Sequence, residues 1–467
     1  MIDKLISYSM NLNLLEMLVI KVSLYKDGLT GVIITPCQKE YEKARQEWNR
    51  AVQKFPEVIV YCSQISDIQN AVHYARRHEM GIRIRSGGHH YQGYSTGNGV
   101  LVIDVSQMKD IRLSGSGQCI IMESGVQNRE VYNFAGEKGY PFPGGTCPTV
   151  GAAGYTLGGG WGYSSRFLGL GCDSLKAVEI VNYEGKVLTA DETCNPDLFW
   201  ALRGAGGGNF GVVTSLKYKL PPRITAVTLV DLEYINPGLE EMAGFLGVWQ
   251  RWLVGLDPRI TINISMYNSP QDGLGIFGRG LFYGSAEEAA FILNPFERDG
   301  AVLSYEELSF FQAMEKIQSS YPDSEKFQST GRFVQRMYGA KERMQIAGLI
   351  AERAEGSVYA AVTVYALGGK IREVSPVSTA YFYRDASYIM GIQSVWENDC
   401  YGEINRQWLY PRFQYIKGLT EGSYVNFPYN RLPDYEEEYY GENVCRLRQT
   451  ESRYDPLHVF SFPQAIR

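Results

Sequence analysis

The chain has 467 residues, of which 45% are hydrophobic and 21% charged, and it contains 50 glycines. This length predicts about two or three domain-sized units, and the composition excludes fibrous and disordered proteins. A net charge of -6 without any long basic run argues against a nucleic-acid partner.

Residues 1–32 are expected to form an N-terminal extension. Their apolar run is interrupted by Glu16 and is followed by no small-residue cleavage site, which predicts neither a signal peptide nor an anchor. The first sixteen residues are an extension or a misassigned start, with Met17 as an alternative initiator. No stretch of about 18 uncharged apolar residues is present to span a membrane. Together with eight scattered cysteines that include no C-x-x-C pair, these features predict a cytoplasmic protein with no metal site and no disulfide framework.

Strands and helices alternate from residue 57 onward. "EVIVYC" (57–62) predicts a buried strand, and "SDIQNAVHYARRHEM" (66–80) predicts a helix capped by Ser66. "GIRIRS" (81–86) predicts a second strand, whose arginines share one face. Further strands are expected at 100–106 and 118–125, and a hairpin with a Glu184-Gly185 turn at 177–190. These segments indicate an α+β unit that ends near residue 220, at "KLPPRIT".

The pattern then changes to long strands. They are expected at 225–235, 259–267, 275–283 and 357–369, and a long helix at 239–256. This mixture predicts one antiparallel sheet backed by helices. The last forty or so residues have the pattern of short strands and loops, which could return to the first unit.

Three glycine-rich segments follow the early strands: 85–99, 143–162 and 203–213. Glycine lets bare backbone approach a ligand, so successive N–H groups can form a nest for an anion. The segments therefore predict a site for a bulky, phosphate-bearing cofactor. The third one contains a G-x-G-x-x-G at Gly206, Gly208 and Gly211, but it follows a predicted helix and precedes a predicted strand. That order excludes a Rossmann dinucleotide site.

Four segments carry a family resemblance: "RIRSGGHHYQGYS", "GGTCPTVGAAGYTLGGGWG", "NPDLFWALRGAGGGNFGVVT" and "YYGENVCRLRQTESRYDPLHVF". In order and spacing they resemble the berberine bridge enzyme-like FAD-linked oxidases, within the vanillyl-alcohol oxidase/p-cresol methylhydroxylase (PCMH) superfamily. The resemblance implies an α+β fold with a PCMH-type FAD-binding domain of two α+β subdomains at 33–220. A substrate-binding domain would span 221–423, and residues 424–467 would return to the FAD-binding domain.

The resemblance also implies that FAD is held by two covalent bonds, from His89 to the flavin 8α-methyl and from Cys147 to flavin C6. An imidazole nitrogen and a thiolate are side-chain nucleophiles able to add to an electron-poor ring. Val150 falls at the position where valine accompanies oxygen-reactive members. The remaining residues implied to contact the cofactor are Arg83, Arg85, Ser86, Gly87, Gly88, Gly93, Ser95, Gly144, Gly145, Gly151, Gly154, Tyr155, Gly158, Gly159, Gly211, Val213 and Asn443.

By the same resemblance the reaction would be oxidation of a secondary alcohol or sugar hemiacetal, by hydride transfer to flavin N5 and reduction of dioxygen to hydrogen peroxide. Tyr424 would take the hydroxyl proton, on a strand that places Asn426 on the same face. A tyrosine of pKa about 10 needs help near neutral pH, and the sequence does not name the helper. Tyr91, Trp161 and Tyr365 are expected to line the same site.

Two positions depart from the family pattern. Tyr155 stands where many relatives have a histidine that stabilises the reduced flavin, and Phe427 replaces a frequent tyrosine of the "Y-V-N-Y" motif. If the second tyrosine of that motif were the base, the alcohol-oxidase mechanism would fail in this chain.

The expected partners are dioxygen and a small substrate: a sugar, a glycoside or an aromatic alcohol. Relatives also act on alkaloids and antibiotic intermediates, and fold analogy does not choose among these substrates. The 33 tyrosines slightly favour a sugar. A flavin dehydrogenase and a catalytically idle flavin-binding relative remain as alternatives.

Overall fold

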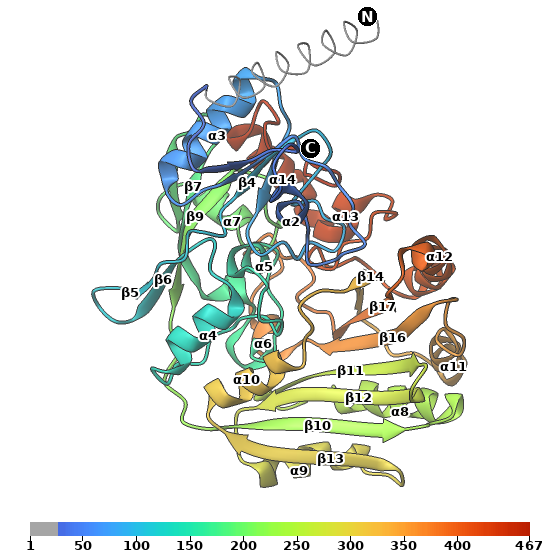
Figure 1. The fold of residues 1–467 in the computed structure, drawn as a ribbon. Coiled ribbons are helices and arrows are strands. Elements are labelled where there is room, and N and C mark those ends of the chain that lie inside the picture. The colour runs from blue at the N-terminus through green and yellow to red at the C-terminus, as the bar shows by residue number, and fades with distance from the viewer. Residues whose placement is uncertain (1–26) are drawn as a thin grey trace, which may run out of the picture.

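The computed structural model describes residues 27–467, so most of the expected N-terminal extension lies outside the described residues. The fold is α+β, as predicted. Figure 1 shows two stacked parts: two small sheets with the C-terminal helices above, and one large sheet with its helices below. The order of elements in the chain therefore matches the change of pattern at residue 220.

The first small sheet has the order β1-β2-β4-β3, with β1 (Val32–Ile34) antiparallel to β2 (Val58–Tyr61). The strands β3 (Ile82–Arg85) and β4 (Leu101–Asp104) run parallel to β2. Helix α3 (Ile65–Arg77) covers this sheet with an apolar face, as the sequence predicts.

The predicted cap of α3 at Ser66 is wrong. The helix begins one residue earlier, after Gln64, whose side chain makes no capping bond. Instead, Asp67 in the first turn accepts hydrogen bonds from the Ser63 backbone N–H (3.1 Å) and from Thr30 Oγ1 (2.6 Å). The carboxylate of Asp67, in the first turn, thus accepts a backbone N–H at the start of the helix, in place of the predicted Ser66 hydroxyl.

The second small sheet is antiparallel, with the order β5-β6-β9-β7-β8. Its strands are β5 (Ile111–Leu113), β6 (Cys119–Glu123), β7 (Leu175–Val181), β8 (Val187–Asp191) and β9 (Val212–Lys219). The predicted hairpin is confirmed as β7 and β8, and Gly185 in its turn has φ of 74°. The third glycine segment lies between helix α7 (Pro196–Ala201) and β9, which confirms that it does not open a helix.

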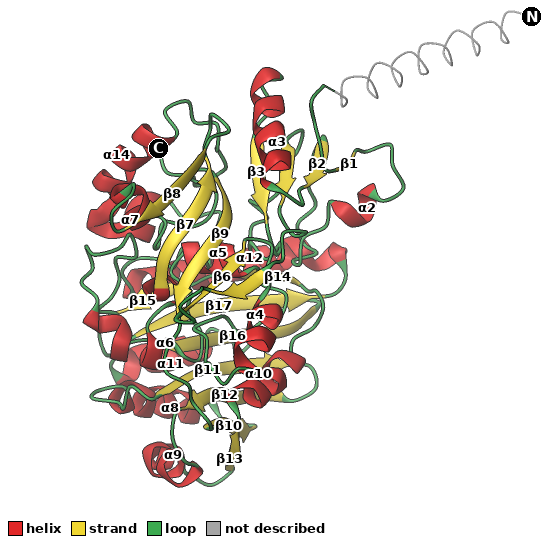
Figure 2. Cartoon of the chain, turned by 90° about the vertical axis from the view of Figure 1, so that its left-hand side faces the viewer, coloured by secondary structure: helices red, strands yellow, loops and turns green. Residues whose placement is uncertain are grey.

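Short helices lie between strands of these two sheets. Helix α2 (Tyr41–Ala44) lies between β1 and β2, and α4 (Asn128–Gly136), α5 (Ala152–Leu157) and α6 (Ser165–Leu168) lie between β6 and β7. Figure 2 shows the two small sheets side by side above the large one.

The large sheet has eight antiparallel strands in the order β13-β10-β12-β11-β16-β17-β14, and β15 pairs with β17. All four strands predicted after residue 220 belong to it. The strands are β10 (Val227–Ile235), β11 (Ile260–Ser269), β12 (Gly273–Phe282), β13 (Ala301–Leu308), β14 (Lys326–Ser329), β15 (Arg332–Val334), β16 (Ser357–Ala366) and β17 (Tyr388–Trp396).

Helices cover only one face of the middle of this sheet. Because side chains alternate along a strand, Tyr388 and Gln393 of β17 lie on opposite faces. Trp249 of α8 (Leu239–Trp252) packs against Tyr388, with ring centroids 6.2 Å apart. The face that carries Gln393 is turned toward the upper part of the molecule. The remaining helices are α9 (Ala286–Leu293), α10 (Phe310–Ser319), α11 (Ala340–Gly348) and α12 (Gly402–Leu419).

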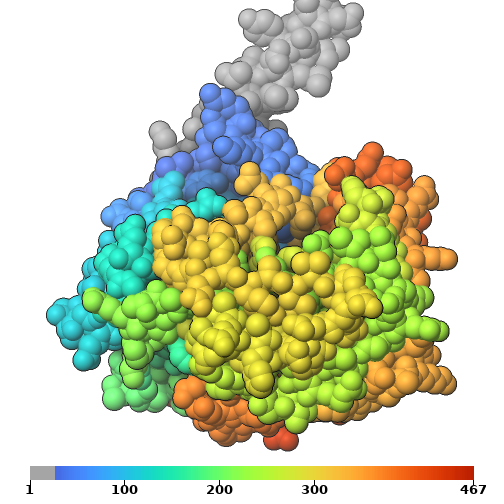
Figure 3. All heavy atoms as spheres, turned by 90° about the horizontal axis from the view of Figure 1, so that it is seen from below, coloured from blue at the N-terminus to red at the C-terminus, as the bar shows by residue number. Residues whose placement is uncertain are grey.

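The last residues form helices α13 (Tyr435–Tyr440) and α14 (Val444–Tyr454) and no strand, so the expected short strands are wrong. The return toward the first unit is present: Tyr440 Oη donates to Ala205 O at 2.7 Å, and Ile466 N–H donates to Asn209 Oδ1 at 3.1 Å. Seen from below, residues of the large sheet and its helices make most of the surface (Figure 3). Over residues 27–467, no helix has the length and apolar character needed to cross a membrane.

Candidate active site

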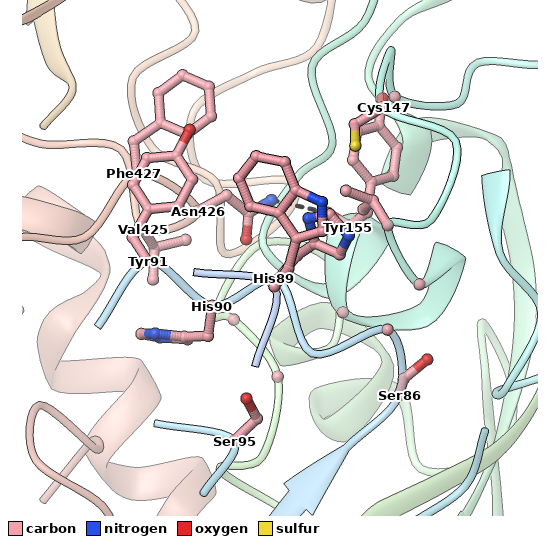
Figure 4. A pocket seen from close by; sticks show the side chains of 18 of the residues that line it. Ser86, His89, His90, Tyr91, Ser95, Cys147, Tyr155, Val425, Asn426 and Phe427 are labelled. Atoms are coloured by element: carbon pink, nitrogen blue, oxygen red, sulfur yellow. Dashed lines mark hydrogen bonds between the residues drawn. The ribbon is translucent and has the colours of Figure 1, made fainter. Parts of the chain in front are cut away.

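A cavity of about 620 Å³ opens between the glycine-rich segments and the uncovered face of the large sheet. Its size is typical of a site for a cofactor with its substrate. Figure 4 shows His89 and Cys147 entering it from different loops, with Tyr91 and Phe427 beside each other. The predicted residues that line it are Arg83, Ser86, Gly87, Gly88, His89, Tyr91, Ser95, Gly145, Cys147, Val150, Gly151, Gly154, Tyr155, Trp161, Gly211, Val213, Tyr365 and Tyr424.

Six residues expected at the cofactor lie outside this lining: Arg85, Gly93, Gly144, Gly158, Gly159 and Asn443. Arg85 is buried in ion pairs with Asp104 and Glu47. The Asn443 amide donates to the carbonyl of Pro376 at 3.0 Å and so fixes a neighbouring loop. The four glycines make room for protein side chains: a Cβ on Gly158, for example, would lie 2.0 Å from Asn426 Oδ1.

The first glycine segment presents a row of free backbone donors. The N–H groups of residues 87–91 donate to no acceptor in the described part of the chain, and Gly88 has φ of 68°. Successive N–H groups around a left-handed residue form a nest for an anion. The nest fits the pyrophosphate of FAD, because it supplies donors without a side-chain charge.

His89 is held by two contacts. Its ring stacks on Trp48, with centroids 5.0 Å apart, and its Nε2 is hydrogen-bonded to Thr149 Oγ1 at 2.7 Å. Burial lowers the pKa of His89 to about 3, so the imidazole is neutral and keeps a free electron pair at neutral pH.

Cys147 shares Thr149 with His89. Burial raises the pKa of the Cys147 thiol, while hydrogen bonds from Thr149 and from the Val150 N–H oppose that rise. Thr149 therefore contacts both residues to which the resemblance assigns a covalent bond with the flavin. Sequence reasoning missed Thr149 and Trp48. The "C-P-T-V-G" motif could have pointed to Thr149, whereas Trp48 lies outside every motif.

Aromatic rings form one wall of the cavity. Tyr91 stacks on Phe427 with an interplanar angle of 4° and centroids 5.3 Å apart. Tyr365 of β16 contacts both Phe427 (5.2 Å) and Trp161 (5.0 Å). Trp161 is fixed by its Nε1–H, which donates to Ala366 O at 2.8 Å. Flat apolar faces at fixed spacing suit a planar or ring-shaped ligand.

Tyr424 lies in a turn rather than on the expected strand, because the Phe427 N–H closes back onto Tyr424 O at 2.9 Å. Its hydroxyl oxygen accepts three hydrogen bonds: from the backbone N–H groups of Gly160 (3.0 Å) and Trp161 (3.1 Å), and from Asn426 Nδ2 (3.1 Å). Burial raises the pKa of Tyr424 to about 12, and the three donors act in the opposite direction. These N–H dipoles are the described groups that favour the phenolate form of Tyr424, although burial outweighs them.

The uncovered face of the large sheet supplies polar groups. Ser265 and Thr363 are hydrogen-bonded across β11 and β16 at 2.8 Å, and Arg279 on β12 is paired with Asp231 at 2.7 Å. Glu325, directly before β14, lines the same cavity. These residues come from separate strands, and no motif in the sequence marks them.

Comparison with known proteins agrees with this geometry. A family model for the FAD binding domain matches residues 56–191, and one described as berberine and berberine like matches residues 423–467. The uncharacterized FAD-linked oxidoreductase YgaK of Bacillus subtilis is 33% identical over 448 residues, which cover 94% of this chain and 98% of that protein. Xylooligosaccharide oxidase of Thermothelomyces thermophilus is 27% identical, over 91% of this chain and 90% of that one.

Solved structures agree as well. Physcomitrella patens BBE-like 1 superposes with a TM-score of 0.87 at 25% identity, covering 96% of this chain and 98% of that one. The fold and the cavity define an FAD-binding oxidoreductase. Within that class, the chain belongs to the berberine bridge enzyme-like FAD-linked oxidoreductases.

Proposed function

We propose that the protein oxidises a secondary alcohol or a sugar hemiacetal to the carbonyl compound and passes the electrons to dioxygen, giving hydrogen peroxide. The carrying observation is one cavity that combines the N–H nest and the His89–Cys147 pair with the polar face of the large sheet. Support also comes from relatives named carbohydrate oxidase (27% identical) and reticuline oxidase (26% identical).

The flavin would be bound through both His89 and Cys147. The neutral imidazole of His89 has a free electron pair for one such bond, and the hydrogen bonds from Thr149 and the Val150 N–H favour the Cys147 thiolate that would form the other. When bound, the cofactor supplies hydride acceptance and the reaction with dioxygen.

The protein's own part is to orient the substrate and to take its hydroxyl proton. Tyr424 is the proposed acceptor, since three N–H donors stabilise its phenolate form in a buried site. Asn426 is the adjustable donor, because its Nδ2 also donates to Tyr155 O at 2.8 Å. It can therefore turn away when the phenolate becomes a phenol.

A dehydrogenase that passes its electrons to another acceptor is the second candidate function. Val150 argues for the oxidase, because it stands at the position where valine accompanies oxygen-reactive members of the family, and its small side chain lines the cavity. Reoxidation of the reduced protein in air separates the two: completion within seconds supports the oxidase, whereas persistence of the reduced form supports the dehydrogenase.

The test begins with acid precipitation of the purified protein and of its His89→Ala, Cys147→Ala and double variants. Yellow colour should pellet with the wild type and with each single variant but not with the double variant. Sugars, glycosides and aromatic alcohols are then screened for peroxide production. Colour that washes out of the wild type would contradict the covalent bonds, and a complete lack of peroxide with rapid substrate-dependent flavin reduction would contradict the oxidase.

A further inference from the structure

Glu325 is a partly buried carboxylate whose side chain has no partner among the described residues. Its side chain lines the cavity, and it makes no hydrogen bond and no ion pair with any residue of the described chain, 27–467. Burial raises the pKa of Glu325, and no neighbouring cation lowers it. An unpaired charge in such a place is costly, and proteins normally pair it or use it.

Arg279, a cation that lines the same cavity, is already engaged. Arg279 Nε and Nη2 donate to the two carboxylate oxygens of Asp231 at 2.7 and 2.8 Å. This bidentate pair is neutral as a unit. Arg279 is therefore already paired, and no described cation pairs with the carboxylate of Glu325.

The backbone of Glu325 is fixed against the segment that supports His89. Its N–H donates to Trp48 O at 3.3 Å, and its carbonyl accepts from Arg50 N–H at 2.7 Å. Between these two contacts, Asn49 Nδ2 donates to the carbonyls of Tyr91 (2.9 Å) and Phe327 (3.1 Å). The carboxylate is thus held on a rigid support rather than on a mobile loop.

Two tyrosines and a cysteine lie near the carboxylate. Burial is the main cause of the raised pKa of Tyr321, Tyr359 and Cys147, and the charge of Glu325 adds to it, which places Glu325 near all three. The ring of Phe327, two residues further on, lies edge-on to Tyr91 at 4.9 Å. A carboxylate among aromatic faces matches the chemistry of an ammonium ion, which gains both a charged hydrogen bond and cation–π contacts.

We propose that the substrate carries a cationic amine in addition to the carbon that is oxidised, and that Glu325 binds this ammonium group. The proposal rests on the proposed function, because it names the substrate class of the same site. A neutral polyol would leave the partly buried carboxylate without a cationic partner, whereas an ammonium group would pair with it.

The experiment measures binding to the flavin-loaded protein at neutral pH under anaerobic conditions. Benzylammonium is compared with benzyl methyl ether, a neutral probe of similar size that has no hydroxyl to oxidise. Dissociation constants come from the change in flavin absorbance and from tyrosine and tryptophan fluorescence. Benzylammonium should bind at least about tenfold more tightly, as one charged hydrogen bond predicts.

Glu325→Gln keeps the shape of the side chain and should abolish this preference. Asp323→Asn is the matched control, since Asp323 is an exposed carboxylate on the same segment and lies outside the cavity lining. The control should keep the preference. Equal binding of the two probes to the wild type, or an unchanged preference in Glu325→Gln, would overturn the proposal.

Methyl β-glucoside tests the competing role of Glu325 as an acceptor for sugar hydroxyls. If Glu325→Gln weakens binding of the glucoside and leaves benzylammonium unaffected, the ammonium proposal is refuted. Failure of the proposed oxidase has a different signature, because it removes peroxide production with every alcohol while the binding preference stays measurable.

Discussion

The three hydrogen bonds to the Tyr424 hydroxyl allow a prediction with two separate readouts. In Tyr424→Phe, the Gly160 and Trp161 N–H groups lose the acceptor that the structure gives them, whereas Asn426 Nδ2 keeps Tyr155 O. An unsatisfied buried donor costs about 1–3 kcal/mol, so the two amides together predict a loss of about 2–6 kcal/mol in the free energy of unfolding. That is a large part of the stability of an ordinary protein.

The second readout is the rate of flavin reduction. If Tyr424 accepts the substrate proton, its removal should slow anaerobic flavin reduction by about 10²–10⁴-fold, with the flavin spectrum retained. In the wild type this rate should rise with pH toward the pKa of about 12, since the phenolate is the active form, and the rise should be absent in the variant.

Tyr381→Phe is the matched control. Tyr381 is also buried, its ring lies 6.0 Å from that of Tyr424, and its hydroxyl has no hydrogen-bond partner in the described structure. Its loss should change neither readout. Denaturant midpoints and stopped-flow absorbance are measured on all three proteins. A stability loss with a flavin-reduction rate within about twofold of the wild type would show that Tyr424 stabilises the turn at Gly160 and Trp161 and is not the proton acceptor.

Three further predictions follow from other contacts. Thr149→Val removes the hydroxyl bonded to His89 and should lower the fraction of flavin that survives acid precipitation; an unchanged fraction would show that His89 needs no such support. Glu438→Gln removes the ion pair of the buried Arg332 and should cost about 3 kcal/mol in a denaturant titration, against no loss for the exposed Glu442→Gln. Stability should fall as pH rises from about 10 to 12, because burial raises the pKa of five tyrosines to about 12 and the unfolded chain loses those protons first; a denaturant midpoint equal at both pH values would contradict this.

Much of the fold could be predicted from the sequence because its signals are local. Strand β2 is a short apolar run, β3 alternates isoleucine with arginine, and the hairpin turn at Gly185 requires a positive φ that glycine allows. The helices near the C-terminus were missed because their sequence is rich in charged and aromatic residues. Packing against the first unit, as at Tyr440 and Ala205, decides their structure.

The candidate site divides in the same way. The residues expected at the cofactor come from contiguous motifs, and most of them line the cavity. The substrate side did not follow, since Asn49 and Phe327 are 278 residues apart in sequence and yet share a hydrogen bond. Glu325 stands in a stretch that resembles an ordinary surface segment. Its position in the cavity depends on this long-range contact, so the sequence did not mark it as a site residue.

Phe427 offers a direct comparison between the two tyrosine positions of the "Y-V-N-Y" motif. Its ring stacks on Tyr91 and contacts Tyr424 with centroids 5.0 Å apart, so a hydroxyl added in Phe427→Tyr would enter the same cavity. The N–H groups of Gly160 and Trp161 are already bonded to the Tyr424 hydroxyl, so a new phenol would not gain them and would keep a high pKa. We therefore expect the rate of flavin reduction in Phe427→Tyr to stay within about threefold of the wild type, as measured by stopped-flow absorbance. A gain in that rate of about tenfold or more, retained in the double variant with Tyr424→Phe, would instead identify position 427 as the base. Tyr424 would then only position the turn at Gly160 and Trp161.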